Sequence, residues 1–401
     1  MKLKGNQRLV IAVGQAVRIS SFLPIEPLVK QVLALVALVV GVAGAQGQTI
    51  SEGNAPAFFR LTASTTTVIT ALSPQGMITW SNATAGTTTG RVQKATTLLG
   101  PSNWVDYVAF NVTGAVTQLR VLDPNPPFNM AYIPAGSFSM GDNLDGDLAA
   151  QPIHTVNVSA FYMDKGEVTK AQWDGVFTWA TNNGYSFNNA GAGKTINHSV
   201  QTVYWYDVVK WCNARSQKEG RTPAYYTDAG LTAVYKIGQA APYVNWNTGY
   251  RLPTETEWEY AARGGLSGKR FPWGDTIAHN QANYYSATNY SYDVSSTRGY
   301  QPSYQVGNYP YTSPMGSLAA NGYGLYDMTG NVWEWCWDWW GSYGSGTQTD
   351  PRGPVTGSDR LLRGGGWSSD AWYCRTANRI SFSPGYGNNF IGFRAVLTSG
   401  Q

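Results

Sequence analysis

The most informative segment of this chain of 401 residues reads Gly330-Asn331-Val332-Trp333-Glu334-Trp335. It closely follows the string Asn321-Gly322-Tyr323-Gly324-Leu325-Tyr326-Asp327 and precedes Arg363-Gly364-Gly365-Gly366-Trp367. The whole chain shares this character, with 45 Gly, 16 Trp and 25 Tyr. Charged residues make up 13% of it, against about 25% in a typical soluble protein. Such a composition indicates a fold that depends on aromatic packing and tight turns.

The formal net charge of +4 arises in the first 45 residues. That segment holds five basic residues and one acid, which leaves 23 basic and 23 acidic residues in the rest of the chain. Because the remainder is neutral overall, its charge gives no argument for binding nucleic acid.

An apolar run from Val32 to Val42 follows the basic stretch and ends at Ala43-Gly44-Ala45. This pattern is typical of a secretory signal peptide, so we expect residues 1–45 to be removed on export to a secreted, periplasmic or cell-surface location. The run is too short for a stable membrane span, which needs about 20 residues. The alternative is an uncleaved amphipathic anchor.

Residues 46–123 contain short alternating segments broken by turn residues, and they predict a small β-sandwich. The segments are Ala57–Ala63, Thr66–Leu72, Gly76–Ser81 and Tyr107–Val112. We expect this domain to be a spacer or an adhesion module. The segment Pro124-Asn125-Pro126-Pro127 can sustain neither a helix nor a central strand, so we place a linker at 124–127 and the second domain at 128–401.

Three helices are predicted in the second domain. Thr169 with Gln172, and Thr254 with Glu257, fit the capping box that starts a helix. The predicted helices are Lys170–Thr181, Asp207–Lys218 and Glu255–Arg263. Beyond Gly264 we find no long helical period, and we expect short strands and long loops.

Further strings extend the pattern in both directions: Tyr132-Ile133-Pro134-Ala135-Gly136, Met140-Gly141, Glu167-Val168-Thr169, Arg251-Leu252-Pro253-Thr254-Glu255, Glu257-Trp258-Glu259, Phe271-Pro272-Trp273-Gly274 and Gly392-Phe393-Arg394. In this order, over residues 128–397, they resemble the formylglycine-generating enzyme (sulfatase-modifying factor) family. The resemblance implies a C-type-lectin-like fold, an irregular α+β domain whose loops are stabilised by calcium.

Enzymes of that family oxidise a cysteine of a sulfatase with molecular oxygen and copper, which soft thiolate ligands hold. By the resemblance, a cysteine pair would lie between the Gly364–Gly366 turn and the strand Arg375-Thr376-Ala377-Asn378-Arg379. That stretch holds Trp367-Ser368-Ser369-Asp370-Ala371-Trp372-Tyr373 and then Cys374 alone. A pair is impossible there, so we assign no catalytic residue and do not expect copper.

The chain contains three cysteines, which allow at most one disulfide bond. We expect a bridge between Cys336 and Cys374, because both flank the region where the Trp-rich loop and the final strands should meet, in an oxidising compartment. Cys212 would then be a buried, inert thiol.

Calcium is the expected cofactor. Asp327 and Glu334 supply two carboxylates with backbone carbonyls between them, which suits a hard cation. The resemblance implies Asp327, Gly330, Val332 and Glu334 as ligands; a turn with solvated acids is the alternative. A second site of the family would use Asn283 and the Tyr284 carbonyl, but Arg298 stands at its acidic position, with Tyr300 following.

The segment Ser368–Phe390 places aromatic residues among small polar ones, a combination that favours a recognition surface. The candidate ligand-binding residues are Trp367, Ser369, Asp370, Trp372, Tyr373, Phe382 and Tyr386. Alternatively, these aromatics belong to the core. The single histidines His154, His198 and His279 have no spacing typical of a metal site.

Two hypotheses follow. The favoured one is an exported, calcium-stabilised binding or accessory protein whose partner is a glycan, a peptide or a protein. The alternative is an oxidase or related oxygenase of the same family, acting on a protein or peptide substrate with other ligands. A sulfatase-activating enzyme is the less favoured interpretation, because the cysteine pair is missing.

Overall fold

The computed structural model describes the backbone of strands between Leu9 and Arg120, then Pro127 and residues 129–399. The chain divides into two compact units, Met1–Asn125 and Pro126–Gln401. The division falls inside the proline-rich segment where the sequence predicts a linker.

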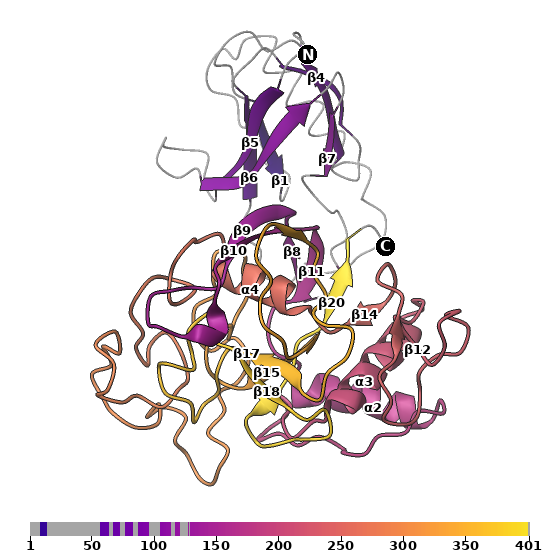
Figure 1. Cartoon of the computed structure of the whole chain (residues 1–401), viewed down its shortest axis with the longest axis vertical. Helices are drawn as coiled ribbons and strands as arrows, with labels where there is room; N and C mark the ends of the chain where they lie inside the picture. The colour runs from indigo at the N-terminus through magenta and orange to yellow at the C-terminus, as the bar shows by residue number, and fades with distance from the viewer. Residues whose placement is uncertain are drawn as a thin grey trace, which may run out of the picture. The chain divides into compact units, whose positions relative to one another are not determined.

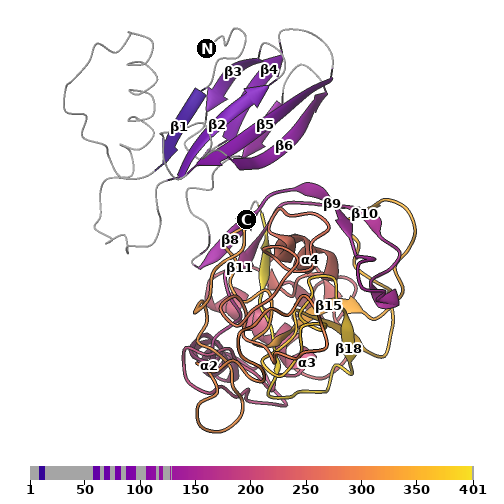
Figure 2. The ribbon, with the colours of Figure 1, turned by 90° about the vertical axis from the view of Figure 1, so that its left-hand side faces the viewer.

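The first unit contains two antiparallel sheets, with strand orders β1-β2-β5-β6 and β3-β4-β7 (Figure 2). Its strands are β1 (Leu9–Val13), β2 (Ala57–Ala63), β3 (Thr67–Leu72), β4 (Met77–Asn82), β5 (Thr87–Ala95), β6 (Val105–Thr113) and β7 (Thr117–Arg120). The four predicted segments coincide with β2, β3, β4 and β6. Strand β1 comes from the predicted leader and pairs with β2. The cleavage site at Ala45 lies outside the described residues, so export stays a prediction.

The second unit is a mixed α/β domain with short strands in several small sheets (Figure 1). The sheet orders are β16-β10-β9, β14-β20-β11-β8, β12-β13 and β18-β17-β15-β19. The strands are β8 (Met130–Ile133), β9 (Gly136–Met140), β10 (His154–Val158), β11 (Phe161–Asp164), β12 (Tyr225–Tyr226), β13 (Tyr243–Val244), β14 (Tyr250–Arg251), β15 (Trp333–Trp339), β16 (Gln348–Thr349), β17 (Arg360–Arg363), β18 (Ile380–Phe382), β19 (Ile391–Gly392) and β20 (Val396–Thr398).

The three α-helices of this unit are α2 (Lys170–Thr181), α3 (Trp205–Lys218) and α4 (Glu255–Arg263). Both predicted capping boxes are formed, at Thr169 and Thr254, and the two helices they start have the predicted bounds. Helix α3 begins two residues before the predicted start, at Trp205, and its N-cap residue Tyr204 makes no side-chain cap. Between α4 and β15 the chain runs as loops, as expected.

Tryptophan side chains fill the largest apolar cluster. Trp173 and Trp211, from α2 and α3, stack with their ring centroids 5.9 Å apart, and Phe393 meets both edge-on. The Trp211 indole N–H donates to the carbonyl of Trp173 at 3.1 Å. The high aromatic content is therefore explained by packing between the helices and the C-terminal strands.

Helix α4 packs against β9, β10, β15 and β17, and all nine of its residues are buried (Figure 1). Its three acids are paired with arginines that come from other parts of the chain or from the next helical turn. Glu255 pairs with Arg379, Glu257 pairs with Arg251, and Glu259 pairs with Arg263 and Arg363. The helix is thus held by charge pairs as well as by apolar contacts. In the described part of the chain, no helix is long and apolar enough to cross a membrane.

Asp338 in β15 provides a pH-dependent contribution to stability. Its carboxylate accepts the backbone N–H of Glu255 at 2.7 Å, at the start of α4. Burial, assisted by the negative charge of Glu255, raises the pKa of Asp338 to about 8. An aspartate in the unfolded chain has a pKa of about 3.9. Between these values the folded state binds more protons, so stability falls as the pH rises through this window.

The variant Asp338→Asn keeps an oxygen acceptor but cannot ionise. We therefore expect its free energy of unfolding, measured relative to that of the wild type, to increase as the pH rises. Urea unfolding of both proteins at pH 5 and pH 8 measures this difference. The control is Asp174→Asn, at a solvent-exposed acid of α2. A difference in unfolding free energy between Asp338→Asn and wild type that is the same at both pH values would contradict the prediction.

Candidate functional site

An open pocket with a volume of about 440 Å³ lies where the Gly364–Gly366 turn, the start of β15 and strand β18 meet. Its apolar wall consists of Trp333, Ile380, Phe382 and Phe390. Its polar wall consists of Tyr285, Ser368, Ser369, Asp370 and Tyr373. The pocket thus combines an aromatic surface with hydroxyls and one carboxylate.

Ser369 fixes the geometry of this pocket. Its hydroxyl accepts the indole N–H of Trp333 at 3.0 Å, and its carbonyl accepts the N–H of Tyr285 at 2.8 Å. Its own N–H donates to the carbonyl of Gly366 at 2.9 Å. One serine therefore joins the glycine turn, β15 and the loop at Tyr285.

The glycine turn has a steric requirement at its centre. Gly365 has φ of 78°, and a Cβ atom there would lie 2.6 Å from the sulfur of Cys374. A side chain at this position would be strained by its backbone and would also collide with the thiol. The turn and the buried Cys374 therefore fit each other closely behind the pocket.

Asp370 is the charged residue among the described lining residues. Its carboxylate accepts the N–H of Trp372 at 3.0 Å and the hydroxyl of Tyr290 at 3.4 Å. Tyr373, 43% exposed, meets Trp333 edge-on with ring centroids 6.2 Å apart. An apolar group could therefore lie against the rings while a donor or a cation reached Asp370.

Four of the seven predicted ligand-binding residues line the pocket: Ser369, Asp370, Tyr373 and Phe382. Trp367, Trp372 and Tyr386 do not line it. Tyr386 contacts the lining residue Phe382, with ring centroids 4.6 Å apart. The candidate set omitted five lining residues: Tyr285, Trp333, Ser368, Ile380 and Phe390. Ser368 and Phe390 are the ends of the predicted segment Ser368–Phe390 and Ile380 lies inside it, whereas Tyr285 and Trp333 lie outside it; Trp333 was visible in the sequence only as part of a motif.

Trp367 belongs to the interior instead. It is 4% exposed and packs against Tyr300, Tyr309 and Tyr311, with ring centroids 5.3 to 5.6 Å away. Its indole N–H donates to the carbonyl of Asn389 at 3.1 Å. For Trp367 the alternative interpretation, a core aromatic, is the one that holds.

The predicted bridge between Cys336 and Cys374 is not formed: all three cysteines are free and buried. Cys336 lies in the apolar cluster of Trp258 and Leu361, whereas Cys374 lies in a separate cluster with Phe271 and Ala371. Flanking the same loop did not bring the two sulfurs together, because each side chain packs into a different core. Burial raises the pKa of each of the three thiols, so thiolates are disfavoured.

The predicted calcium loop brings Asp327 and Glu334 near a third acid, Glu167, which the sequence pattern did not assign to it. Burial raises the pKa of Asp327 to about 6, and the charge of Glu334 adds to the rise. Burial and the charges of Asp327 and Glu334 raise the pKa of Glu167 well above its usual range. Three carboxylates therefore repel one another here.

One guanidinium partly compensates this charge. Arg394 donates to both carboxylate oxygens of Glu334, at 2.7 and 2.6 Å, and the indole N–H of Trp258 donates to the same group at 2.8 Å. Glu167 accepts the N–H of Val332 at 3.0 Å and the amide of Asn331 at 2.6 Å. The carboxyl groups of Asp327 and Glu167 supply oxygen atoms of the kind that bind a hard divalent cation, and binding such an ion would require them to lose their protons.

Side chains alone do not complete such a site. Across the described residues, no three Asp, Glu, His or Cys side chains are grouped so that they could hold a metal ion. A calcium ion here would therefore also need backbone carbonyls, which is the role expected for Gly330 and Val332.

The second predicted calcium position would use an oxygen of Asn283 and the Tyr284 carbonyl, and the neighbouring polar groups are already engaged with one another. The amide of Asn283 donates to the carbonyl of Tyr311 at 2.9 Å and to the side chain of Asn331 at 3.2 Å. The Tyr284 hydroxyl donates to Asp293 at 2.6 Å. Arg298 forms an ion pair with the same Asp293, 3.0 Å away. An arginine therefore stands where the resemblance implies an acidic ligand, and the second calcium site stays a prediction.

The three histidines lie apart and have separate hydrogen-bond partners. His154 meets the carbonyl of Pro152 at 3.0 Å. His198 and His279 meet the hydroxyls of Thr312 and Thr297, each at 2.9 Å.

Residues 120–399 match the family model described as "Sulfatase-modifying factor enzyme 1-like domain". The chain is 33% identical over 306 residues to the formylglycine-generating enzyme of Bos taurus, covering 71% of this chain and 78% of that protein. It is also 33% identical over 302 residues to the formylglycine-generating enzyme of Streptomyces coelicolor, covering 69% of this chain and 93% of that one. Among solved structures, Treponema denticola variable protein 1 is similar with a TM-score of 0.52 and 31% identity, covering 67% and 94% of the two chains.

The cysteine arrangement makes a direct prediction. Titration of the native protein with a thiol reagent should give no rapid reaction, because all three sulfurs are buried. In denaturant without a reductant, all three thiols should react. A count of one reactive thiol in denaturant would mean that a disulfide bond had formed.

Proposed function

Since this chain belongs to the sulfatase-modifying factor family, we propose that it is an exported, calcium-stabilised binding or accessory protein that uses the family's frame without its oxidation chemistry. The observation that carries the proposal is the composition of the pocket beside the glycine turn. Aromatic rings, hydroxyls and the carboxylate of Asp370 line it, and no cysteine is among its described lining residues.

The one thiol close to this pocket argues against an oxidase. Cys374 is fully buried behind Ser369, with its sulfur 4.0 Å from the Ser369 carbonyl. Its pKa lies well above the usual range because of burial, with the charge of Asp370 as the next cause. Copper is held by thiolates, and neither this protonated sulfur nor the hydroxyls of Ser368 and Ser369 supply such ligands.

The pocket favours a ligand with an apolar or ring-shaped body and a hydrogen-bond donor or positive charge. Exposed rings at Tyr285 and Tyr373 provide contact area at a low cost in conformational entropy. Asp370 would accept the donor. A peptide segment or a glycan has this chemistry, and both belong to the proposal.

Calcium would stabilise the loop behind the pocket. The resemblance implies Glu334 as a ligand, but both of its oxygens accept hydrogen bonds from Arg394. We therefore propose that Glu167 takes its place and holds the ion with Asp327 and the carbonyls of Gly330 and Val332. The bound ion would neutralise the repulsion between these acids. The ion would also help to position Trp333, which lines the pocket and lies next to both Val332 and Glu334 in the chain.

Glycan and peptide arrays probed with the full chain test the binding function. For any hit, we expect Tyr373→Ala and Phe382→Ala to weaken binding by about tenfold or more, as for aromatic residues at the centre of an interface. The control Tyr243→Ala removes an exposed tyrosine of β13 outside the pocket and should leave the hit unchanged. Hits that survive both pocket substitutions would refute the binding site.

The same preparation distinguishes the oxidase alternative. It is incubated with copper, oxygen and a sulfatase-type cysteine peptide, and the peptide is analysed by mass spectrometry. We expect no aldehyde product. Stoichiometric copper uptake together with an aldehyde would overturn the proposal.

The calcium site is tested by thermal unfolding in a chelator and in calcium. A ligand that binds only the folded state adds about 2.7 kcal/mol when its free concentration is about 100 times its dissociation constant. We expect calcium to raise the melting temperature of the wild type and to have a much smaller effect on Glu167→Gln. The control variant Asp174→Asn should keep the full calcium effect. An identical melting temperature of the wild type in both buffers would exclude the site.

A further inference from the structure

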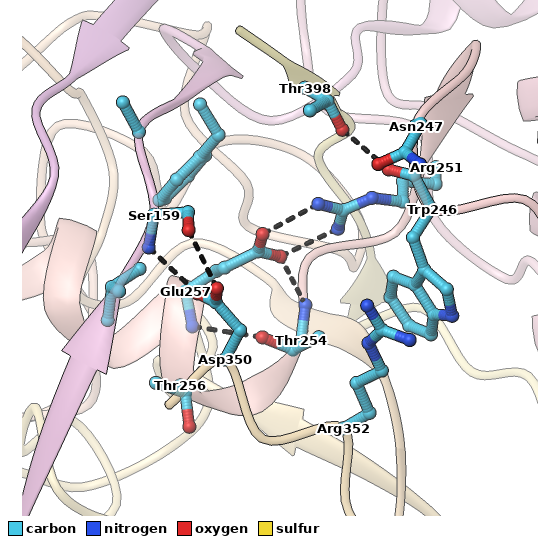
Figure 3. A pocket seen from close by; sticks show the side chains of 13 residues that line it. Ser159, Trp246, Asn247, Arg251, Thr254, Thr256, Glu257, Asp350, Arg352 and Thr398 are labelled. Atoms are coloured by element: carbon cyan, nitrogen blue, oxygen red, sulfur yellow. Dashed lines mark hydrogen bonds and ion pairs between the residues drawn. The ribbon is translucent and has the colours of Figure 1, made fainter. Parts of the chain in front are cut away.

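A second pocket, with a volume of about 160 Å³, lies on the same domain at the start of α4 (Figure 3). It is lined by residues of the loop between β10 and β11, of the segment leading to α4, and of the loop after β16. It shares no lining residue with the pocket at Ser369. Its charged side chains are Arg251, Glu257, Asp350 and Arg352.

Arg352 is held in place without an acidic partner. Its guanidinium lies over the indole ring of Trp246, 4.1 Å from the ring centroid. Within the described part of the chain, no carboxylate forms an ion pair or a hydrogen bond with it. Partial burial and the like charge of Arg251 lower the pKa of Arg352, while the negative charges of Asp350 and Glu257 across the pocket oppose this shift without forming a direct ion pair. The guanidinium stacks on the indole and the residue is exposed, so its N–H donors stay available at the pocket.

Asp350 is likewise held without a cationic partner. Its carboxylate accepts the N–H and the hydroxyl of Ser159, both at 2.7 Å. Its backbone adopts the left-handed conformation, with φ of 43°, which a non-glycine residue adopts at some cost. No lysine or arginine pairs with Asp350 among the described residues. A carboxylate has about four lone-pair sites, so two acceptor positions remain.

The other two charges neutralise each other. Arg251 donates to both oxygens of Glu257, at 2.7 and 2.6 Å. Glu257 also accepts the N–H of Thr254 at 2.8 Å. The buried Nε of Arg251 has no hydrogen-bond partner, which leaves one further donor on a side chain that lines the pocket. Figure 3 shows Asp350 beside Ser159 and Arg352 beside Trp246, on opposite sides of the space next to this pair.

We propose that this pocket binds a small zwitterion of the α-amino-acid class, with its carboxylate on Arg352 and its ammonium group on Asp350. The two charges without ion partners are of opposite sign and border the same space. A ligand that carries both charges satisfies both, whereas a simple anion would meet the carboxylate of Asp350 and a simple cation would meet Arg352.

The size of the pocket agrees with this ligand. A water molecule occupies about 30 Å³ of the liquid, so the pocket has room for a ligand of a few non-hydrogen atoms. Pockets for drug-sized molecules measure about 300–1,000 Å³. The proposed ligands are therefore glycine, alanine and other amino acids of similar size.

Calorimetric titration of the full chain tests the proposal, with glycine and alanine as probes and acetate and methylammonium as their single-charge counterparts. We expect the amino acids to bind and each counterpart to bind at least about tenfold more weakly, a difference of about 1.4 kcal/mol. Arg352→Gln and Asp350→Asn should each weaken binding of the amino acids by a similar factor.

Two controls match these variants. Arg221 also lies near an aromatic ring, 5.6 Å from Tyr250, and Asp228 also accepts a backbone N–H and a hydroxyl, both from Thr232. Both residues lie outside the pocket, so Arg221→Gln and Asp228→Asn should bind the amino acids like the wild type. Absence of binding at millimolar concentrations would overturn the proposal. Equal binding of acetate and glycine, with no effect of Asp350→Asn, would overturn it in favour of a plain anion site.

Discussion

The buried ion pair between Arg394 and Glu334 is the interaction on which the second domain depends. It joins the C-terminal segment to β15, and the indole of Trp258 attaches α4 to the same carboxylate. Arg394 also donates to the carbonyl of Tyr326 at 2.9 Å, in the loop that precedes the predicted calcium ligands. Both charges are almost completely buried, and loss of one partner from such a pair costs about 3–5 kcal/mol because the other charge is left without compensation.

Buried pairs of the same kind occur along α4, where the three acids pair with Arg251 and Arg363 of the diagnostic strings and with Arg379. Glu257 pairs with Arg251, and Glu259 pairs with Arg363, which directly precedes the glycine turn. Glu255 pairs with Arg363 and with Arg379. The sequence predicts a strand over Arg375–Arg379, but these residues form a turn and a loop, and Arg379 immediately precedes β18. The strings that resemble the family are therefore mainly the partners of a buried charge network. The strings thus specify the buried charge network that holds the domain together, and they do not determine which side chains line the pocket.

Local signals explain what the sequence could predict. The capping boxes at Thr169 and Thr254 gave the bounds of two helices, because a capping box involves residues only three positions apart. The pocket depends on contacts between distant residues: the carbonyl of Ser369 meets the N–H of Tyr285, and its hydroxyl meets the indole of Trp333. No periodicity reports such contacts, so Tyr285 and Trp333 were missed. The predicted bridge between Cys336 and Cys374 was wrong for the same reason, since positions near one loop in sequence say little about which core each side chain enters.

Separation of the charge network from the pocket also bears on how far the pocket lining can vary while the domain keeps its fold. The residues between the Gly364–Gly366 turn and Arg375 do not take part in the buried ion pairs. Arg363 and Arg375, which flank this segment, do take part and so hold its two ends in place. Arg375 pairs with Asp147 at 2.8 Å and stacks on Trp372, 3.9 Å from the ring centroid. Substitution between these anchors changes the lining of the pocket without breaking a buried ion pair. The buried residues of the segment, Trp367, Ala371 and Cys374, are constrained by packing, whereas exposed lining residues such as Tyr373 can change at a smaller cost to stability.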